Sequence, residues 1–329
     1  MQPHPYRNNL DGIDLRRPAD CRKILLLDKH TRIEGLCSEA VFMEDIVEGN
    51  LSPVTEDFWF TRSGRTAKYE IIKVVTSYDK PLSELDYLIL DKLATAEGIL
   101  KTGIVHFDES TNTFRVFRHL EGQRYDQLRE MGNVWPLSGK GMIAEDADRN
   151  EERTIKACDF LAERGLLKEA AIKRIFANCI LDRAALWDVD AFTLAGQTVV
   201  ALEVKHKYPT NNEKFGVNVG QEDLFGFLIG TEMAVIHIIL EKPVHRPAFP
   251  AIDLLTKEEY IEKAVWRFIR LVPENLSGAV SRAPASTSIY GHMELSYRGI
   301  PVEKFAVLKG LREKGVDVRG RLLRGLHKE

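Results

Sequence analysis

Few cysteines are present in this sequence, and the compact motifs that bind nucleotides or zinc are missing. The four cysteines form no C-x-x-C pair, since they lie at Cys21, Cys37, Cys158 and Cys179. This spacing argues against a zinc site and favours a reducing environment, so we expect a cytoplasmic protein. The motifs G-x-x-x-x-G-K-[ST], G-x-G-x-x-G, H-E-x-x-H and G-x-S-x-G do not occur. Their absence argues against a Walker-type loop, a dinucleotide fingerprint, a zinc-protease helix and a serine-hydrolase elbow.

Long apolar runs and a strong net charge are also lacking. No apolar run reaches the length of a membrane-spanning helix, and the opening sequence MQPHPYRNNLDGIDLRR has no apolar core of the secretory type. We therefore expect no membrane partner. The formal net charge of -3 gives no global sign of nucleic-acid binding, but an enzyme that cuts nucleic acid needs only a local basic cleft. With 329 residues, 44% of them hydrophobic, the chain can form two modest domains or one large one.

Residues 1–140 show the short patterns of a mixed α/β region. We expect strands at 22–28, 69–78 and 113–120 and a helix at 83–100. Ser83 is the expected N-cap of that helix. Segment 132–141 is rich in glycine, proline and serine, so it marks a domain boundary near residue 140. The region is a candidate for target recognition, dimerisation or partner docking.

The central segment, residues 141–245, has the most regular periodicity. We expect a helix at 143–164, strands at 174–181, 186–194 and 198–204, a helix at 218–230 and a strand at 233–240. The second and third of these strands are separated by a short turn, so they predict an antiparallel hairpin. If the turn consists of Ala195 and Gly196, Asp188 faces Glu203 across the hairpin.

Three charged residues interrupt the apolar strands of this hairpin. Asp190 lies in the first strand, and Glu203 and Lys205 lie in the run VVALEVK of the second. Alternate residues of a strand face the same way, so Glu203 and Lys205 share one face. A lone Glu-X-Lys pair usually marks a solvated face, but this run is apolar enough to be covered on both sides. Buried charges are costly unless they bind something, and the simplest ligands are a divalent metal and a phosphate. Asp188 is an alternative first acidic residue, but apolar residues bracket Asp190 on both sides.

An acidic residue, a hairpin and an acidic-X-Lys sequence resemble the active site of the PD-(D/E)XK nuclease superfamily, and the order helix, three strands, helix, strand resembles its core. The resemblance covers roughly residues 141–242, with Val189 where the family often has proline. It implies an α/β protein with a mixed sheet and a restriction-endonuclease-like core, and a reaction that depends on Mg²⁺, with Mn²⁺ as a substitute. Asp190 and Glu203 would hold the metal. Lys205 would orient or deprotonate the attacking water, or stabilise the pentavalent phosphorus.

The resemblance also implies two further catalytic residues. Many members of the family carry a glutamate on the first helix of the core, which Glu152 matches, with Glu145 and Glu151 as alternatives. In the exonuclease branch, the second helix carries a glutamine, which Gln221 matches. A tyrosine follows that glutamine four residues on in the family, where this chain has Phe225.

Residues 246–329 predict a helical extension with a basic tail. A helix is expected at 255–272, with Thr256 as its N-cap. From Arg298 to the end of the sequence, nine lysine or arginine residues accompany four acidic residues. We expect this basic tail to help hold a phosphate backbone.

These features predict a metal-dependent DNA nuclease, with an endonuclease of the restriction, defence or mobile-element type as the leading subclass. Substantial segments flank the core, which favours that subclass over the first alternative, a repair or junction-resolving nuclease. A second alternative is a non-catalytic nucleic-acid-binding subunit with the same fold, and a third is a nuclease that cuts RNA. The expected partners are DNA and either a second copy of the chain or other subunits.

Overall fold

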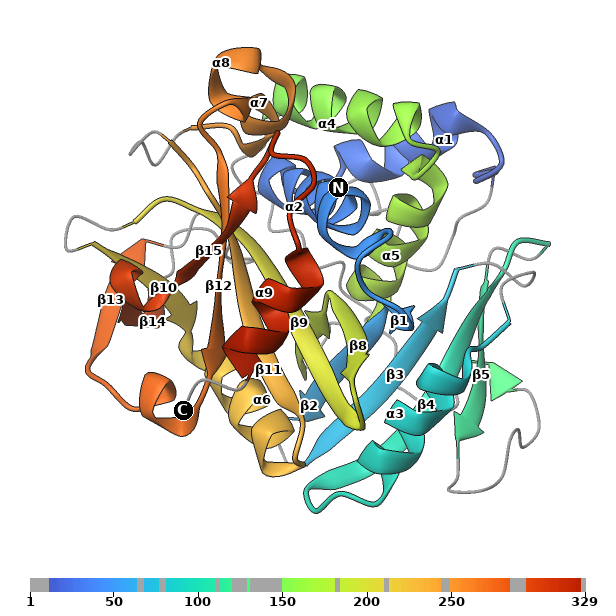
Figure 1. Ribbon diagram of the computed structural model, residues 1–329. Coiled ribbons are helices and arrows are strands. Elements are labelled where there is room, and N and C mark those ends of the chain that lie inside the picture. Colours follow the sequence, from blue (N-terminus) through green and yellow to red (C-terminus); the bar gives the residue numbers. More distant parts are fainter. Residues whose placement is uncertain are drawn as a thin grey trace. The chain divides into compact units, whose positions relative to one another are not determined.

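The chain forms two compact units, each made of segments that are separate in the sequence (Figure 1). The computed structural model describes residues 12–63, 68–76, 81–110, 113–119, 129–130, 150–180, 184–209, 213–243, 249–284 and 294–326. The first unit holds residues through His30 and Thr55–Val189, and the second holds Thr31–Val54 and Asp190–Glu329. Neither unit is therefore one continuous stretch of sequence.

The first unit is built on a six-stranded sheet with the strand order β6-β5-β4-β3-β2-β7. Its elements are α1 (Pro18–Leu26), β2 (Phe58–Ser63), β3 (Tyr69–Val75), α3 (Glu84–Ala94), β4 (Ile99–Asp108), β5 (Thr113–His119), β6 (Arg129–Glu130), α4 (Glu151–Glu163), α5 (Leu167–Ile180) and β7 (Ala184–Val189). Strands β3 and β4 are parallel, and parallel neighbours need a crossover, which α3 provides. Phe60, Phe107 and Phe176 are fully buried in the core of this unit.

The second unit contains a six-stranded sheet of order β1-β8-β9-β11-β12-β15 and a three-stranded sheet of order β10-β14-β13. Its strands are β1 (Val54–Thr55), β8 (Ala191–Ala195), β9 (Thr198–Lys207), β10 (Lys214–Asn218), β11 (Ala234–Glu241), β12 (Val265–Leu271), β13 (Val280–Pro284), β14 (Glu294–Pro301) and β15 (Ala306–Gly310). Its helices are α2 (His30–Phe42), the π-helix η1 (Met43–Val47), α6 (Val219–Gly230), α7 (Ala251–Thr256), α8 (Glu258–Ile261), the short helices η3 (Pro273–Leu276) and η4 (Val302–Lys304), and α9 (Val318–Leu326).

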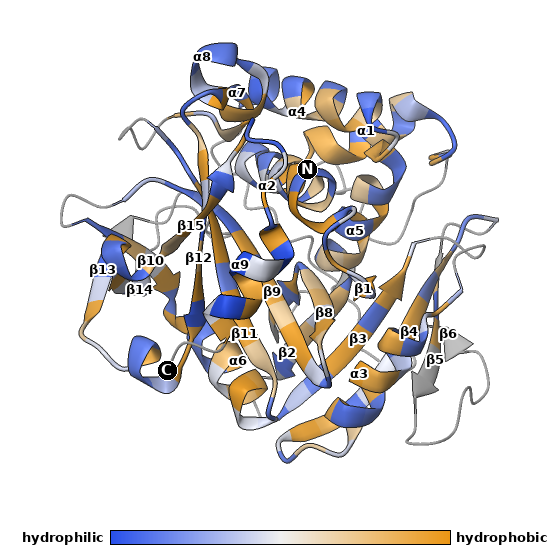
Figure 2. Ribbon diagram, in the orientation of Figure 1, coloured by the Kyte–Doolittle hydropathy of each residue, from blue (hydrophilic) through white to orange (hydrophobic). Residues whose placement is uncertain are grey.

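Strands β9 and β11 form the centre of the six-stranded sheet. They are parallel neighbours, and the segment between them contains α6, which packs on β11. Consecutive residues of both strands are buried, as expected for strands covered on two faces. Figure 2 shows the hydrophobic colouring along these strands. Charged side chains on β9 therefore lie in an apolar setting.

Several predicted elements are confirmed, and the α/β class with them. The strands predicted at 69–78, 113–120, 198–204 and 233–240 are β3, β5, β9 and β11, and the helix predicted at 218–230 is α6. The helix predicted after Ser83 is α3, and its first turn carries a capping box. The Ser83 hydroxyl accepts a hydrogen bond from the backbone of Asp86, whose carboxylate accepts one from the backbone of Ser83. The helix ends at Ala94, earlier than predicted, because β4 begins at Ile99.

Three predicted elements are wrong. The strand predicted at 22–28 is wrong because residues 22–26 form the end of α1, where Pro18 occupies the first turn and buried residues recur at helical spacing. Residues 174–181, also predicted as a strand, lie mostly in α5. The helix predicted at 255–272 divides into the end of α7, α8 and strand β12, so Thr256 closes a helix instead of capping one. The sequence VWRFIRL of β12 is rich in aromatic and β-branched residues, which suit a pleated surface.

The remaining expectations concern the arrangement around α4. The helix predicted at 143–164 is described from Glu151 to Glu163, and its earlier residues, like the boundary near residue 140, fall outside the described part of the chain. From α4 the observed order of elements is α4, α5, β7, β8, β9, β10, α6, β11. Helix α5 therefore occupies the place of the strand that was predicted at 174–181. The predicted bounds at residues 140 and 245 and the restriction-endonuclease-like core remain predictions. No helix among the described residues has the length and apolar character of a membrane span.

Candidate functional site

Strands β8 and β9 form the antiparallel hairpin that we predicted, but their register differs. The observed pairing begins with Ala191 opposite Leu202 and leaves Gly196 and the residue after it as the turn. Gly196 has a φ of 64°, a conformation that glycine adopts without a steric penalty. Continued by one residue, this register sets Asp190 opposite Glu203.

The strand predicted at 186–194 is divided at Asp190. Its first part is β7, which belongs to the sheet of the first unit, and its second part is β8. Asp188 lies in β7 and pairs with Trp59 of β2. The predicted pairing of Asp188 with Glu203 is therefore wrong, because the turn lies one residue later than we assumed.

Four of the predicted site residues meet in the second unit. The Nζ atom of Lys205 lies 2.5 Å from Oε1 of Glu203 and 4.0 Å from Oδ2 of Asp190. Nε2 of Gln221 donates a hydrogen bond to the same Glu203 oxygen at 2.6 Å. Oδ2 of Asp190 accepts a hydrogen bond from the backbone N–H of Val204 at 2.5 Å. We call Asp190, Glu203, Lys205 and Gln221 the carboxylate–lysine cluster.

The carboxylate–lysine cluster is shielded from solvent. The side chain of Glu203 is 1% exposed and that of Asp190 is 3% exposed, while that of Lys205 is 31% exposed. This burial excludes the solvated strand face that a lone Glu-X-Lys pair usually marks. Charged groups held away from water in this way are costly to the fold unless they are paired or bind a ligand.

Helix α6 positions Gln221 against β9. Asn218 is the N-cap of the helix, and its side-chain oxygen accepts a hydrogen bond from the backbone N–H of Gly220 at 2.8 Å. Gln221 follows in the first turn. The cap fixes the direction in which this turn starts, so the glutamine amide is directed at Glu203.

Two further ionisable side chains lie on the face of the sheet that carries Glu203. Lys207 follows Lys205 by two residues on β9 and donates a hydrogen bond to the carbonyl of Gly216. Burial, and then the charge of Lys205, lower the pKa of Lys207 to about 8. His237 pairs with Glu203 on the neighbouring strand β11, and burial, followed by the two lysine charges, holds its pKa well below the ordinary value. His237 is therefore neutral at physiological pH.

The structure adds Glu39, which the sequence did not indicate. Glu39 lies on α2 and offers a carboxylate oxygen within 4.8 Å of one from Asp190, close enough for both oxygens to bind one divalent ion. We predicted the helical glutamate of the site at Glu152. No local pattern links Glu39 to Asp190, because α2 precedes the hairpin by a long stretch of sequence that folds into the other unit.

Glu152 belongs to the first unit and is not a member of the carboxylate–lysine cluster. Its side chain is 77% exposed on α4 and forms an ion pair with Lys156, one turn further along, at 2.7 Å. Of the two alternatives, Glu151 is exposed on the same helix and Glu145 lies outside the described residues. The catalytic role of Glu152 remains a prediction.

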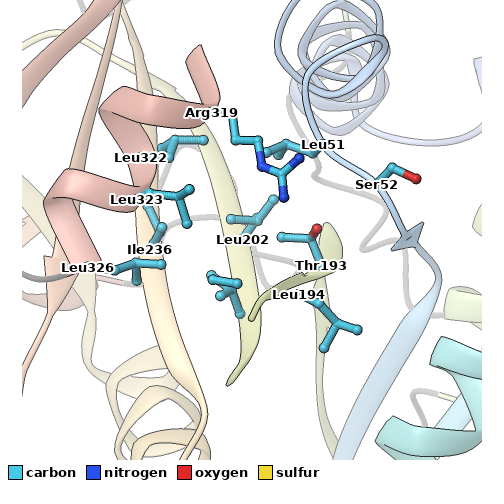
Figure 3. A pocket seen from close by; sticks show the side chains of 12 residues that line it. Leu51, Ser52, Thr193, Leu194, Leu202, Ile236, Arg319, Leu322, Leu323 and Leu326 are labelled. Atoms are coloured by element: carbon cyan, nitrogen blue, oxygen red, sulfur yellow. The ribbon is translucent and has the colours of Figure 1, made fainter. Parts of the chain in front are cut away.

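An apolar cavity lies on the other face of β9. Leu202 and Ile236 line it from the sheet, and Leu322 lines it from α9, while Arg319 extends across it (Figure 3). Its volume of about 20 Å³ is room for little more than one water molecule. Because Leu202 and Glu203 face opposite sides of the strand, this cavity is separate from the carboxylate–lysine cluster and too small for a substrate.

The oxygen ligands of the site fit a hard divalent cation. Glu39 and Asp190 bring carboxylate oxygens within 4.8 Å of each other, and carboxylate oxygens are the ligands that Mg²⁺ prefers, usually together with several waters. Lys205 adds a positive charge that an anionic substrate oxygen could contact. This set of residues is suited to binding a metal and a phosphate side by side.

Comparison of the chain with protein-family models, with curated proteins and with solved structures finds no match. The geometry of the carboxylate–lysine cluster is therefore the basis on which a function is inferred.

Proposed function

We propose that this protein is a Mg²⁺-dependent nuclease that hydrolyses phosphodiester bonds in DNA. The observation that carries the proposal is the burial of Asp190 and Glu203 around the ammonium of Lys205 on the central hairpin. Charges held in an apolar strand destabilise the fold, so such clusters occur preferentially where they act on a ligand. The same residues carry the resemblance to the PD-(D/E)XK superfamily.

Each residue of the cluster has a distinct task in this proposal. Asp190 and Glu203, together with Glu39, would hold Mg²⁺, which supplies a bound water of lowered pKa and neutralises charge on the phosphate. Lys205 would contact the attacked phosphate and stabilise the charge that develops on its oxygens. Gln221 would keep Glu203 in its orientation through the hydrogen bond to Oε1.

Positive charge next to the cluster supports a polyanionic substrate. Lys207 lies two residues beyond Lys205 on β9, and Lys214 opens β10, the next strand along the chain. These lysines extend the positive charge along two strands, which suits a chain of phosphates better than a single phosphate. The overall net charge of -3 does not oppose this, because the field that a substrate meets is local.

The test compares cleavage of plasmid and linear DNA by the parent protein and by variants of the cluster. Glu203→Gln and Lys205→Ala are each expected to lower the initial rate in Mg²⁺ by at least about a hundredfold, because preorganised charges act on the transition state. Asp190→Asn should lower the rate as much as Glu203→Gln, and Asp188→Asn should have a milder effect. EDTA should abolish cleavage by the parent. Circular dichroism verifies that each variant is folded.

The matched control is Glu241→Gln, which breaks an ion pair with Arg267 in the same sheet but outside the cluster, and should leave the rate unchanged. A larger loss for Asp188→Asn than for Asp190→Asn would identify Asp188 as the metal ligand. If the parent cuts no nucleic acid in Mg²⁺, or if Glu203→Gln and Lys205→Ala cut as fast as the parent, the proposal fails. A non-catalytic nucleic-acid-binding role would then take its place.

A further inference from the structure

The three-stranded sheet carries two glycines at adjacent positions on one face. Gly216 of β10 and Gly299 of β14 are direct partners in the antiparallel pairing. Directly paired residues point to the same side of a sheet. Two neighbouring positions of this face therefore have no side chain of their own.

Tyr297 and Lys214 lie across these two glycines. The position that a Cβ atom would occupy at Gly216 is 2.8 Å from Cδ2 of Tyr297, and the corresponding position at Gly299 is 2.9 Å from Cδ of Lys214. A side chain at either position would collide with them, so the glycines are what allow the ring and the lysine stem to lie against the strands. Tyr297 is half-buried and Lys214 is exposed. We call Tyr297, Lys214, Gly216 and Gly299 the tyrosine–glycine platform.

The tyrosine–glycine platform is connected to the carboxylate–lysine cluster through two elements. The ammonium of Lys207, from the cluster strand β9, donates a hydrogen bond to the carbonyl of Gly216. Strand β10 then ends at Asn218, the cap of α6, and this helix carries Gln221, which binds Glu203. The platform therefore lies on the strand that leads directly into the site.

We propose that the platform binds an unpaired nucleobase of the substrate, close to the phosphate that Lys205 contacts. Tyr297 lies against Gly216 and is only half-buried, so part of its side chain stays accessible to a ligand. Aromatic rings next to positive charge are the usual means of holding single strands, because every base has a π-face. Lys214 supplies the charge for the neighbouring phosphate.

The proposal deepens the proposed nuclease function and rests on it, since it specifies the class of substrate. A base inside a duplex is stacked on both sides and cannot reach the ring of Tyr297. The substrate strand must therefore be single-stranded, frayed or flipped out at this position. Because the ring would bind a base by stacking and not by hydrogen bonds, we expect it to favour no particular sequence.

The experiment measures binding of a fluorescent oligothymidylate by anisotropy, in EDTA so that no cleavage occurs. Tyr297→Ala should weaken binding roughly fivefold to a hundredfold, the range for the loss of one stacked base. Tyr297→Phe keeps the ring and should bind like the parent. Gly216→Ala should also weaken binding, because its Cβ displaces the ring. The matched control is Tyr260→Ala, which removes a half-buried tyrosine that packs on Phe249 in the same unit and should change nothing.

Equal binding by the parent and Tyr297→Ala would overturn the platform, and so would an equal loss for Tyr297→Ala and Tyr297→Phe, which would assign the effect to the hydroxyl. If Tyr297→Ala does not fold, Tyr297→Leu covers Gly216 without an aromatic ring and should show the same weakening. The two proposals fail separately. A parent that cuts DNA but binds oligothymidylate independently of Tyr297 retains the nuclease and loses the platform, whereas ring-dependent binding without cleavage retains the platform alone.

Discussion

The ammonium of Lys207 lies in a partly buried position beside a second lysine. Burial is the largest influence on its pKa, Lys205 lowers it further, and Glu203 raises it in part. The neutral ring of His237 on β11 is close enough that Lys207 contributes to the lowering of its pKa. The charge of Lys207 is compensated in part by Glu203 and by the hydrogen bond to the carbonyl of Gly216. The charged form of Lys207 is thus disfavoured in the folded protein.

This setting predicts a dependence of stability on pH. The pKa of Lys207 falls from 10.5 to about 8 on folding, so the unfolded chain binds more protons than the folded chain between these two pH values. Stability should therefore rise with pH across that window, at most about 1.4 kcal/mol per pH unit from this group. Below pH 8 both states are protonated and the penalty is constant. We expect the free energy of unfolding of the parent, measured in urea relative to Lys207→Met, to increase from pH 8 to pH 10.

The control for this measurement is Lys257→Met. Lys257 is exposed, and its hydrogen bond to Asp253 raises its pKa above the ordinary value. Its contribution to stability is therefore lost only as pH rises through that higher pKa, so the difference between parent and Lys257→Met should not increase between pH 8 and pH 10. If the difference in free energy of unfolding between the parent and Lys207→Met does not change from pH 8 to pH 10, the ammonium of Lys207 is better solvated than its position indicates.

Two glycines of the second unit allow the effect of backbone conformation on stability to be measured without a steric clash. Neither Gly196, in the turn of the β8–β9 hairpin, nor Gly226, within α6, has any atom within 4 Å of the place where a Cβ would stand. Gly196 has a φ of 64°, whereas Gly226 lies in a helix. Gly196→Ala should therefore destabilise the protein by about 1 kcal/mol, and Gly226→Ala should stabilise it by up to about 1 kcal/mol. Thermal unfolding of both variants tests this, and the same sign for both would contradict the assigned conformations.

Elements whose local signals agree with their surroundings could be predicted from the sequence. Strand β9 has a long apolar run, and α6 follows a clear cap at Asn218. The errors at residues 22–28 and 174–181 have one cause. Both lie in helices, α1 and α5, that pack against each other and are buried broadly, and a short apolar run does not distinguish a buried helix from a buried strand.

In the candidate site too, residues linked by a local sequence pattern could be predicted and residues brought together only by the tertiary fold could not. Glu203 and Lys205 lie on β9 and Gln221 lies in the first turn of α6, so periodicity and the family resemblance were enough to group them. Asp190 was preferred over Asp188 because apolar residues bracket it, whereas the pairing of Asp188 with Glu203 depended on a two-residue turn placed one residue too early. Glu39 could not be found, because its proximity to Asp190 is a tertiary contact without a local pattern.

At the scale of the whole chain, charge is distributed unevenly. The formal net charge is -3, yet the segment from Arg298 onward has nine basic and four acidic residues. Within it, α9 buries Leu322, and two of its arginines have structural contacts. Arg321 donates to the carbonyl of Leu308 at 2.5 Å, and Arg324 lies 3.7 Å from Asp317. Replacing these arginines therefore affects both the local packing of α9 and any anion that it contacts.

The basic helix α9 predicts a salt dependence of DNA binding. Each phosphate contact contributes about -0.9 to the slope of log affinity against log salt concentration on duplex DNA. Joint replacement of Arg319, Arg321 and Arg324 by glutamine should weaken binding in EDTA and make this slope shallower, by at most about 3 if all three contact phosphates. The control variant removes the same number of positive charges from exposed positions of the first unit: Arg16→Gln, Arg17→Gln and Lys23→Gln. Equal slopes for the two variants would mean that α9 contributes only net charge. A shallower slope for the α9 variant alone, at unchanged circular dichroism, would place phosphates at this helix.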